Sequence, residues 1–131
     1  MINRFAMFAA LMLSFGLAVS QPATALDKKP YDAAAVAADQ AAGKPVVIHV
    51  TAPWCSTCSA QKSAIESFKD DPSLKDVALY ELDYDTGGDA LKALNVRSQS
   101  TLIAYKGKKE TGRSAGDTSA KGLEALMKST L

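Results

Sequence analysis

The amino-acid sequence predicts an α/β fold built on a mixed β-sheet. Three observations support this: helix-like and strand-like segments alternate along the chain, an apolar β-branched run at 46–51 is typical of a strand buried on both faces, and residues 101–105 and 110–114 read as a hairpin. With 47% apolar and 22% charged residues, the chain has the composition of a folded globular protein. Its 131 residues are enough for one domain.

The first 25 residues differ from the rest and are predicted to be a signal peptide. Arg4 gives a positive start, residues 5–19 are almost wholly apolar, and Ala23-Thr24-Ala25 matches the small–x–small pattern that signal peptidase reads. The apolar run is shorter than the roughly 20 residues that a membrane span needs, although an uncleaved anchor stays open as the alternative. We therefore expect residues 26–131 to be one periplasmic domain, without stable membrane association after cleavage.

The charge of the expected mature chain is balanced. Arg4 is the only charged residue of the first 25, so removing them leaves 14 basic residues, of the chain's 15, against 14 acidic ones. This balance gives no electrostatic case for binding nucleic acid or an anionic membrane surface. Export would also place the two cysteines where disulfides form and persist.

The first half of the domain is expected to start with a polar lead-in at 26–30 and an Ala-rich helix at 31–42. Asp32 is the expected N-cap, Gly43 the C-terminal stop, and Pro45 blocks any continuation. The buried strand at 46–51 ends at Ala52-Pro53. A helix then covers residues 56–69, and its apolar spacing predicts one buried stripe: Ala60, Ala64, Ile65 and Phe68.

The second half is expected to contain three strands and two helices. The strands are 77–82, 101–105 and the polar edge strand 110–114; the helices are 89–94, after Gly87-Gly88, and 118–129, with Asp117 or Thr118 as cap and Leu123, Leu126 and Met127 facing inward. A helix joins the first two strands of the domain, so they should be parallel with a right-handed crossover. The last two strands should be antiparallel.

The stretch Trp54-Cys55-Ser56-Thr57-Cys58 holds both cysteines, between the buried strand and the helix that follows it. A structural disulfide is one interpretation, but closing a loop of about four residues stabilises little. A metal site is another. A zinc site wants four ligands and the domain has two Cys and one His, which leaves a dithiol site for Cu(I) or a shared iron–sulfur cluster.

Thiol–disulfide exchange is the interpretation that the position of this motif favours. Cys55 would stand at a helix start, where free N–H groups lower its pKa and leave it exposed as the attacking thiolate. Cys58, one turn further along the helix, would resolve the mixed disulfide. This predicts an enzyme, a thiol–disulfide oxidoreductase, that uses no cofactor and no resident metal.

The whole of residues 26–131 resembles the thioredoxin superfamily, which carries Trp-Cys-x-x-Cys after a central buried strand. The segment 95–103 looks like the family's loop before its third core strand, Lys106-Gly107-Lys108 like its hairpin turn, and Gly116 like its late glycine. The resemblance implies a three-layer α/β/α sandwich with a four-stranded mixed sheet and about four helices, without thioredoxin's extra N-terminal strand.

The same resemblance implies roles for the motif. Cys55 would be the nucleophile, Cys58 the resolving thiol and Trp54 a lining residue of the docking surface; a plain surface or core aromatic is the alternative for Trp54. Partners would be protein thiols and disulfides, and we expect a monomer. Ser56-Thr57 matches none of the family's well-known middle pairs, so direction stays open. The absence of a His inside the motif favours a reductant, recharged by a membrane thiol-relay protein because the periplasm is kept oxidising.

Two neighbours of the motif depart from the family. Ser100 stands before Thr101, where a cis-proline is usual; since a cis bond without proline costs about 2.5–4 kcal/mol, we expect a trans Gln99–Ser100 bond. The Ser100 hydroxyl would bind a thiolate or its own backbone. His49 replaces a buried acid six residues before Cys55. It would be either a general base for Cys58 or a satisfied core histidine whose pKa is lowered by burial.

Overall fold

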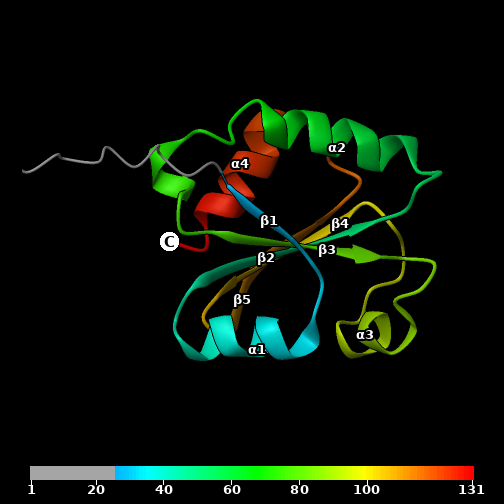
Figure 1. The fold of residues 1–131 in the computed structure, drawn as a ribbon. Helices are drawn as coiled ribbons and strands as arrows, with labels where there is room; N and C mark the ends of the chain where they lie inside the picture. Colours follow the sequence, from blue (N-terminus) through cyan, green and yellow to red (C-terminus); the bar gives the residue numbers. More distant parts are fainter. Residues whose placement is uncertain (1–25) are drawn as a thin grey trace, which may run out of the picture.

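The computed structural model describes residues 26–131; the predicted signal peptide lies outside the described residues. These residues form three layers, with a five-stranded mixed sheet between helices α2 and α4 on one face and α1 and α3 on the other (Figure 1). The predicted three-layer α/β/α class is therefore confirmed. Over this part of the chain, no helix is both long and apolar enough to cross a membrane.

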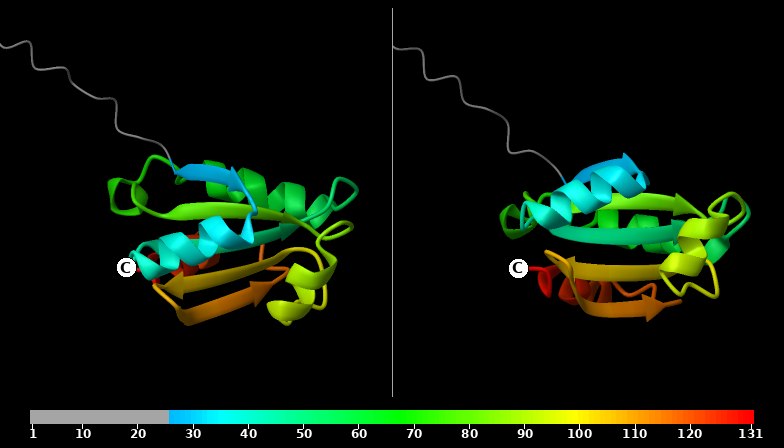
Figure 2. Two further views of the ribbon diagram at one scale, coloured as in Figure 1. Left: turned by 60° about the horizontal axis from the view of Figure 1, so that its bottom comes forward. Right: turned by 90° about the horizontal axis from the view of Figure 1, so that it is seen from below.

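The elements follow one another in nearly the predicted order. They are β1 Asp27–Pro30, α1 Ala33–Ala41, β2 Pro45–Thr51, α2 Ser56–Glu66, the short 3₁₀ helix η1 Pro72–Leu74, β3 Ala78–Asp83, α3 Gly88–Ala93, β4 Thr101–Lys106, β5 Lys109–Ala115 and α4 Ala120–Lys128. The strand order is β1-β3-β2-β4-β5. Strands β1, β3 and β2 run parallel, while β4 and β5 are antiparallel to their neighbours, as the sheet in Figure 2 shows.

Strand β1 corrects the predicted strand count of four. Residues 27–30, expected to be a lead-in, pair in parallel with β3, from Asp27 opposite Ala78 to Pro30 opposite Glu81. The strand lies at the edge of the sheet and most of its side chains are exposed, so it lacks the apolar alternation by which a strand is recognised. Lysine and proline are typical of such edges, because they discourage pairing with another chain.

Strand β2 is the centre of the sheet, which explains its uniformly apolar sequence. It pairs with β3 on one side and β4 on the other, and residues 46–51 are all buried. Successive side chains alternate between faces. Val47 joins the core beneath α2 and α4, whereas Ile48 and Val50 join the core above α1 and α3. His49, two residues after Val47, therefore belongs to the α2–α4 face.

The helix ends agree with the sequence for α1 and differ for α4. The Asp32 carboxylate accepts a hydrogen bond of 2.7 Å from the Ala35 N–H, and Gly43 ends the helix with a φ of +75°. The N-cap of α4 is Ser119, not Asp117 or Thr118. Asp117 instead accepts hydrogen bonds from the backbone N–H and the hydroxyl of Ser119. It thereby shapes the turn before the helix rather than its first residue.

The buried face of α2 also differs from the predicted stripe, and the helix ends at Glu66 rather than residue 69. Ile65 is buried as predicted, but Ala60 is exposed. The inward face consists of Cys58, Gln61 and Ile65, which are spaced as i, i+3 and i+7 on one side of a helix. Counting apolar residues alone shifted the expected stripe, because its second member is a glutamine.

Candidate active site

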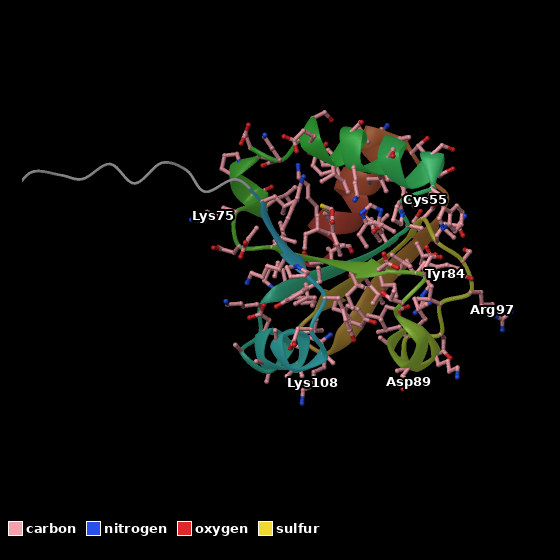
Figure 3. All side chains as sticks on the ribbon, turned by 45° about the vertical axis from the view of Figure 1, so that its right-hand side comes forward. Cys55, Lys75, Tyr84, Asp89, Arg97 and Lys108 are labelled. Carbon is pink, nitrogen blue, oxygen red and sulfur yellow. A yellow bond between two sulfur atoms is a disulfide. The ribbon has the colours of Figure 1, made fainter. Side chains whose placement is uncertain are left out.

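The cysteine pair lies where β2 leads into α2, at one end of the sheet. Cys55 is the N-cap of α2, with extended backbone angles (φ −88°, ψ 104°), and its Sγ accepts a hydrogen bond of 3.0 Å from the Cys58 N–H. Figure 3 shows Cys55 on the same side of the molecule as Tyr84 and Arg97, and far from Lys75 at the other end. The predicted place of Cys55, at a helix start that offers free N–H groups, is confirmed.

Cys55 and Cys58 form a disulfide, with their Cα atoms 5.3 Å apart. They pack with Ala52, and the Tyr84 ring covers this small cluster. Cys55 is 4% exposed and Cys58 1%, so the expectation that Cys55 is exposed is wrong for the oxidised protein. The reason is that its sulfur turns inward, toward the Cys58 N–H and the Ser100 hydroxyl.

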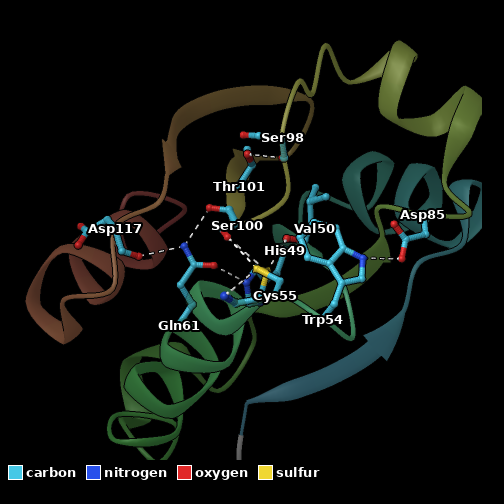
Figure 4. The surroundings of a disulfide bond; sticks show 11 residues. His49, Val50, Trp54, Cys55, Gln61, Asp85, Ser98, Ser100, Thr101 and Asp117 are labelled. Atoms are coloured by element: carbon cyan, nitrogen blue, oxygen red, sulfur yellow. Dashed lines mark hydrogen bonds between the residues drawn. A yellow bond between two sulfur atoms is a disulfide. The ribbon is translucent and has the colours of Figure 1, made fainter.

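The Ser100 hydroxyl touches both sulfurs of the disulfide. Its Oγ lies 3.1 Å from Cys55 Sγ and 3.3 Å from Cys58 Sγ (Figure 4). Of the two orientations expected from the sequence, the structure has the one directed at the dithiol. When the disulfide is reduced, this hydroxyl can donate to a thiolate, and a hydrogen bond to the charged form lowers the pKa of the thiol.

The backbone at Ser100 has an unusual conformation. As expected, the Gln99–Ser100 bond is trans, since residues 26–131 contain no cis peptide bond. The φ of Ser100 is +61°, in the left-handed region that L-residues rarely adopt. Proline is held near −65° and has no N–H, whereas the Ser100 N–H donates to the Val50 carbonyl at 2.9 Å. This backbone therefore cannot accept a proline without rearranging.

His49 is fully buried between β2 and α2 but makes no hydrogen bond to either sulfur. Its Nε2 is 2.8 Å from Gln61 Oε1, while its Nδ1 is buried without a hydrogen-bond partner. Burial is the main cause that lowers the pKa of His49, and the hydrogen bond to Gln61 and the charge of Glu81 oppose it. The imidazole is consequently neutral at neutral pH.

Gln61 is the residue of this site that sequence reasoning missed. It is fully buried, and its Nε2 donates hydrogen bonds of 2.9 Å to the carbonyl oxygens of Ser100 and Asp117. A signal was available: Gln61 is three residues after Cys58 and four before Ile65, on the buried side of an amphipathic helix. A buried amide needs hydrogen-bond partners, so such a residue has to join two or more elements.

Trp54 and Thr101 lie next to the site without touching the sulfurs. Trp54 is 60% exposed, and its indole Nε1–H donates to Asp85 Oδ2 at 2.9 Å. It is therefore a surface residue beside the disulfide, held by a carboxylate that the sequence did not reveal as a partner. The Thr101 hydroxyl donates to the Ser98 carbonyl at 2.9 Å, which places Thr101 at the start of β4 as a structural residue.

The assembled groups are suited to thiol–disulfide exchange. Two cysteines close a disulfide, a helix N-terminus and a hydroxyl offer hydrogen bonds to the first sulfur, and an exposed aromatic residue lies beside it. Within residues 26–131, no three or more His, Cys, Asp or Glu side chains are grouped as metal ligands. No contact in the described structure favours the metal or cluster interpretation.

Comparisons with known proteins agree with this chemistry. A family model described as Thioredoxin matches residues 24–129. Thioredoxin-2 of Saccharomyces cerevisiae is 38% identical over 96 residues, which cover 73% of this chain and 86% of that protein. Thioredoxin Asp f 29 of Aspergillus fumigatus is 26% identical over 84 residues, covering 64% and 76%. The crystal structure of Trxlp from Edwardsiella tarda has a TM-score of 0.74 at 35% identity, covering 77% of this chain and 98% of that one.

Proposed function

Because this chain belongs to the thioredoxin family and is a thiol–disulfide oxidoreductase, we propose that it is exported and reduces disulfide bonds of periplasmic proteins. The observation that carries the proposal is the position of Cys55 at the N-cap of α2, in a disulfide with Cys58. Two hydrogen-bond donors, the Cys58 N–H and the Ser100 hydroxyl, reach its sulfur. They make Cys55 the better of the two thiolates.

The reaction takes two exchanges. The Cys55 thiolate attacks one sulfur of a substrate disulfide, so that a mixed disulfide forms and one substrate thiolate leaves. The Cys58 thiolate then attacks Cys55 Sγ, which releases the second substrate thiolate and leaves the Cys55–Cys58 disulfide. The substrate gains two electrons and, in water, two protons. A membrane thiol-relay protein returns the two electrons to the enzyme.

His49 is the proposed proton acceptor for the Cys58 thiol during the second exchange. Its neutral imidazole has a free lone pair on the buried Nδ1, and a histidine that is neutral near pH 7 suits a general base. In single-turnover measurements, His49→Ala should slow resolution of the mixed disulfide and leave the attack by Cys55 unchanged. Equal resolution rates in the variant and the wild type would remove His49 from the reaction.

Trapping of the mixed disulfide tests the proposed function most directly. Cys58→Ser should accumulate mixed disulfides between Cys55 and periplasmic proteins, whereas the matched variant Cys55→Ser should trap far fewer. The wild-type protein should also reduce insulin. If neither variant traps a protein and the reduced enzyme leaves insulin intact, the proposal is wrong.

Direction and location need their own measurements. Equilibration with glutathione buffers should give a reduction potential nearer thioredoxin's, about −270 mV, than the −120 mV of a strong periplasmic oxidant. A value near the oxidant end would reverse the proposed direction. N-terminal sequencing of the protein from a periplasmic fraction should start at Leu26; recovery of the intact chain from the membrane fraction would show an anchor instead.

A further inference from the structure

Gln61 lies in the interior next to the dithiol, and no step of the proposed reaction uses it. It is fully buried on the face of α2 that also carries Cys58. Its amide joins three elements, because it contacts Ser100 before β4, Asp117 before α4 and His49 on β2 (Figure 4). A buried amide that meets all of these partners restricts how each of them can sit.

The hydrogen bonds of Gln61 determine which way its amide points. Both N–H bonds of Nε2 are used by carbonyl oxygens, those of Ser100 and Asp117, each at 2.9 Å. Turning the amide over would set its oxygen against two other oxygens, none of which can donate. Oε1 must therefore face His49, and it can only accept a hydrogen bond.

The tautomer of His49 follows from this orientation. Since Oε1 accepts at 2.8 Å, the proton of the neutral imidazole is on Nε2, and Nδ1 is bare. Three charged groups act on this ring: Glu81, its partner across β3, Lys62 on α2 and Lys28 on β1. Its partner on β4 is the apolar Leu102. Gln61 is the group in direct contact with the ring's Nε2, so it decides which nitrogen carries the proton.

The position of Ser100 depends on the same amide. A serine at a φ of +61° is strained and stays there only where its surroundings hold it. Its N–H donates to the Val50 carbonyl, and its own carbonyl accepts from the Gly116 N–H and from Gln61 Nε2, each at 2.9 Å. The first two are backbone contacts; the third comes from a side chain. With the backbone held in this way, the Ser100 hydroxyl lies against both sulfurs.

We propose that Gln61 is a positioning residue of the active site, which holds the Ser100 hydroxyl on the dithiol and keeps the proton of His49 on Nε2. Gln61 touches neither sulfur by a hydrogen bond and acts through these two neighbours. The proposal rests on the proposed function in one respect, that Cys55 is the attacking thiol.

The first test is the pKa of the Cys55 thiol in the reduced protein, measured from the pH dependence of alkylation by iodoacetamide. Gln61→Met removes the amide at similar side-chain length, and Gln40→Met makes the same change in α1, on the other side of the sheet. Gln61→Met should raise the pKa of Cys55 by up to about one unit, because a hydrogen bond to a charged group is weakened. Gln40→Met should leave it unchanged.

A double-mutant cycle separates positioning from a general loss of structure. In a Ser100→Ala background the hydroxyl is gone, so adding Gln61→Met should have little further effect on the pKa of Cys55. An equal effect in both backgrounds would show that Gln61 does not act through Ser100. A folded Gln61→Met protein with the wild-type pKa would overturn that part of the proposal outright.

The second test needs no variant. His49 is the only histidine of the chain, so ¹⁵N NMR of the folded protein shows one pair of imidazole nitrogens. Nε2 should give the signal of a protonated nitrogen and Nδ1 that of a bare one; the reverse pattern would overturn the proposed tautomer. Both tests remain informative if the protein proves inactive on protein disulfides, so failure of the proposed function and failure of this inference are distinguishable.

Discussion

Replacing Ser100 by proline tests the conformation of the loop that touches the dithiol. Thioredoxin-like proteins usually carry a proline at this position, so the change looks conservative from the sequence. The structure indicates the opposite, because Ser100 has a φ of +61° and donates its N–H to the Val50 carbonyl. A proline ring restricts φ to about −65° and removes that donor.

Two costs add up for Ser100→Pro. The Val50 carbonyl loses its hydrogen bond beside a fully buried residue, and an unsatisfied buried acceptor costs about 1–3 kcal/mol. A proline at a backbone angle that it cannot adopt costs at least about 1 kcal/mol more. We expect the free energy of unfolding to fall by about 2–4 kcal/mol.

Ser100→Gly is the matched control. Glycine adopts a positive φ without strain, which relieves about 1–2 kcal/mol, but it also has more freedom to lose on folding and lacks the hydroxyl that contacts the sulfurs. These effects oppose each other, so the free energy of unfolding should stay within about 1 kcal/mol of the wild type.

Urea unfolding of the oxidised proteins, followed by far-UV circular dichroism, measures both changes. A Ser100→Pro protein with the wild-type midpoint would refute the reasoning, since it would mean that the loop accepts proline at no cost. A Ser100→Gly protein as unstable as the proline variant would also refute it, because the loss would then come from the hydroxyl and not from the backbone.

Two further predictions concern stability. Burial lowers the pKa of His49 below 6.5 in the folded protein; the unfolded chain therefore binds a proton that the folded one refuses, and stability should fall as the pH drops from about 6.5 toward the folded pKa. His49→Gln should flatten this part of the profile of urea midpoints against pH, and an unchanged slope would contradict the assignment. Gly122→Ala should lower the unfolding free energy by about 0.5–2 kcal/mol, because the new Cβ would collide with the Asp117 carboxylate and meet the Ser119 hydroxyl that caps α4. In Gly88→Ala the new Cβ meets nothing within 4 Å, so thermal melting should show that variant unchanged or more stable; a gain in both variants would show that the α4 cap tolerates the methyl group.

The sequence by itself determined the features that depend on neighbours along the chain. The buried strand at 46–51, the helix after it and the cysteine pair between them follow from composition and spacing within about 25 residues. So do the Asp32 cap and the stop at Gly43. These features are local: hydrophobic periodicity and capping act over one or two turns, and they can be read without knowing what packs against them.

Only the tertiary structure decided what surrounds the dithiol. Ser100 is 45 residues from Cys55, and Gln61 is 39 residues from Ser100 and 12 from His49. Strand β1 is likewise defined by its pairing with β3, some fifty residues away, and not by its own side chains. No local pattern encodes such contacts, since a polar side chain in the interior chooses its partner from whatever the fold brings within hydrogen-bonding distance. The sequence thus identified the bond that is exchanged, and the fold placed Ser100, Gln61 and His49 around it.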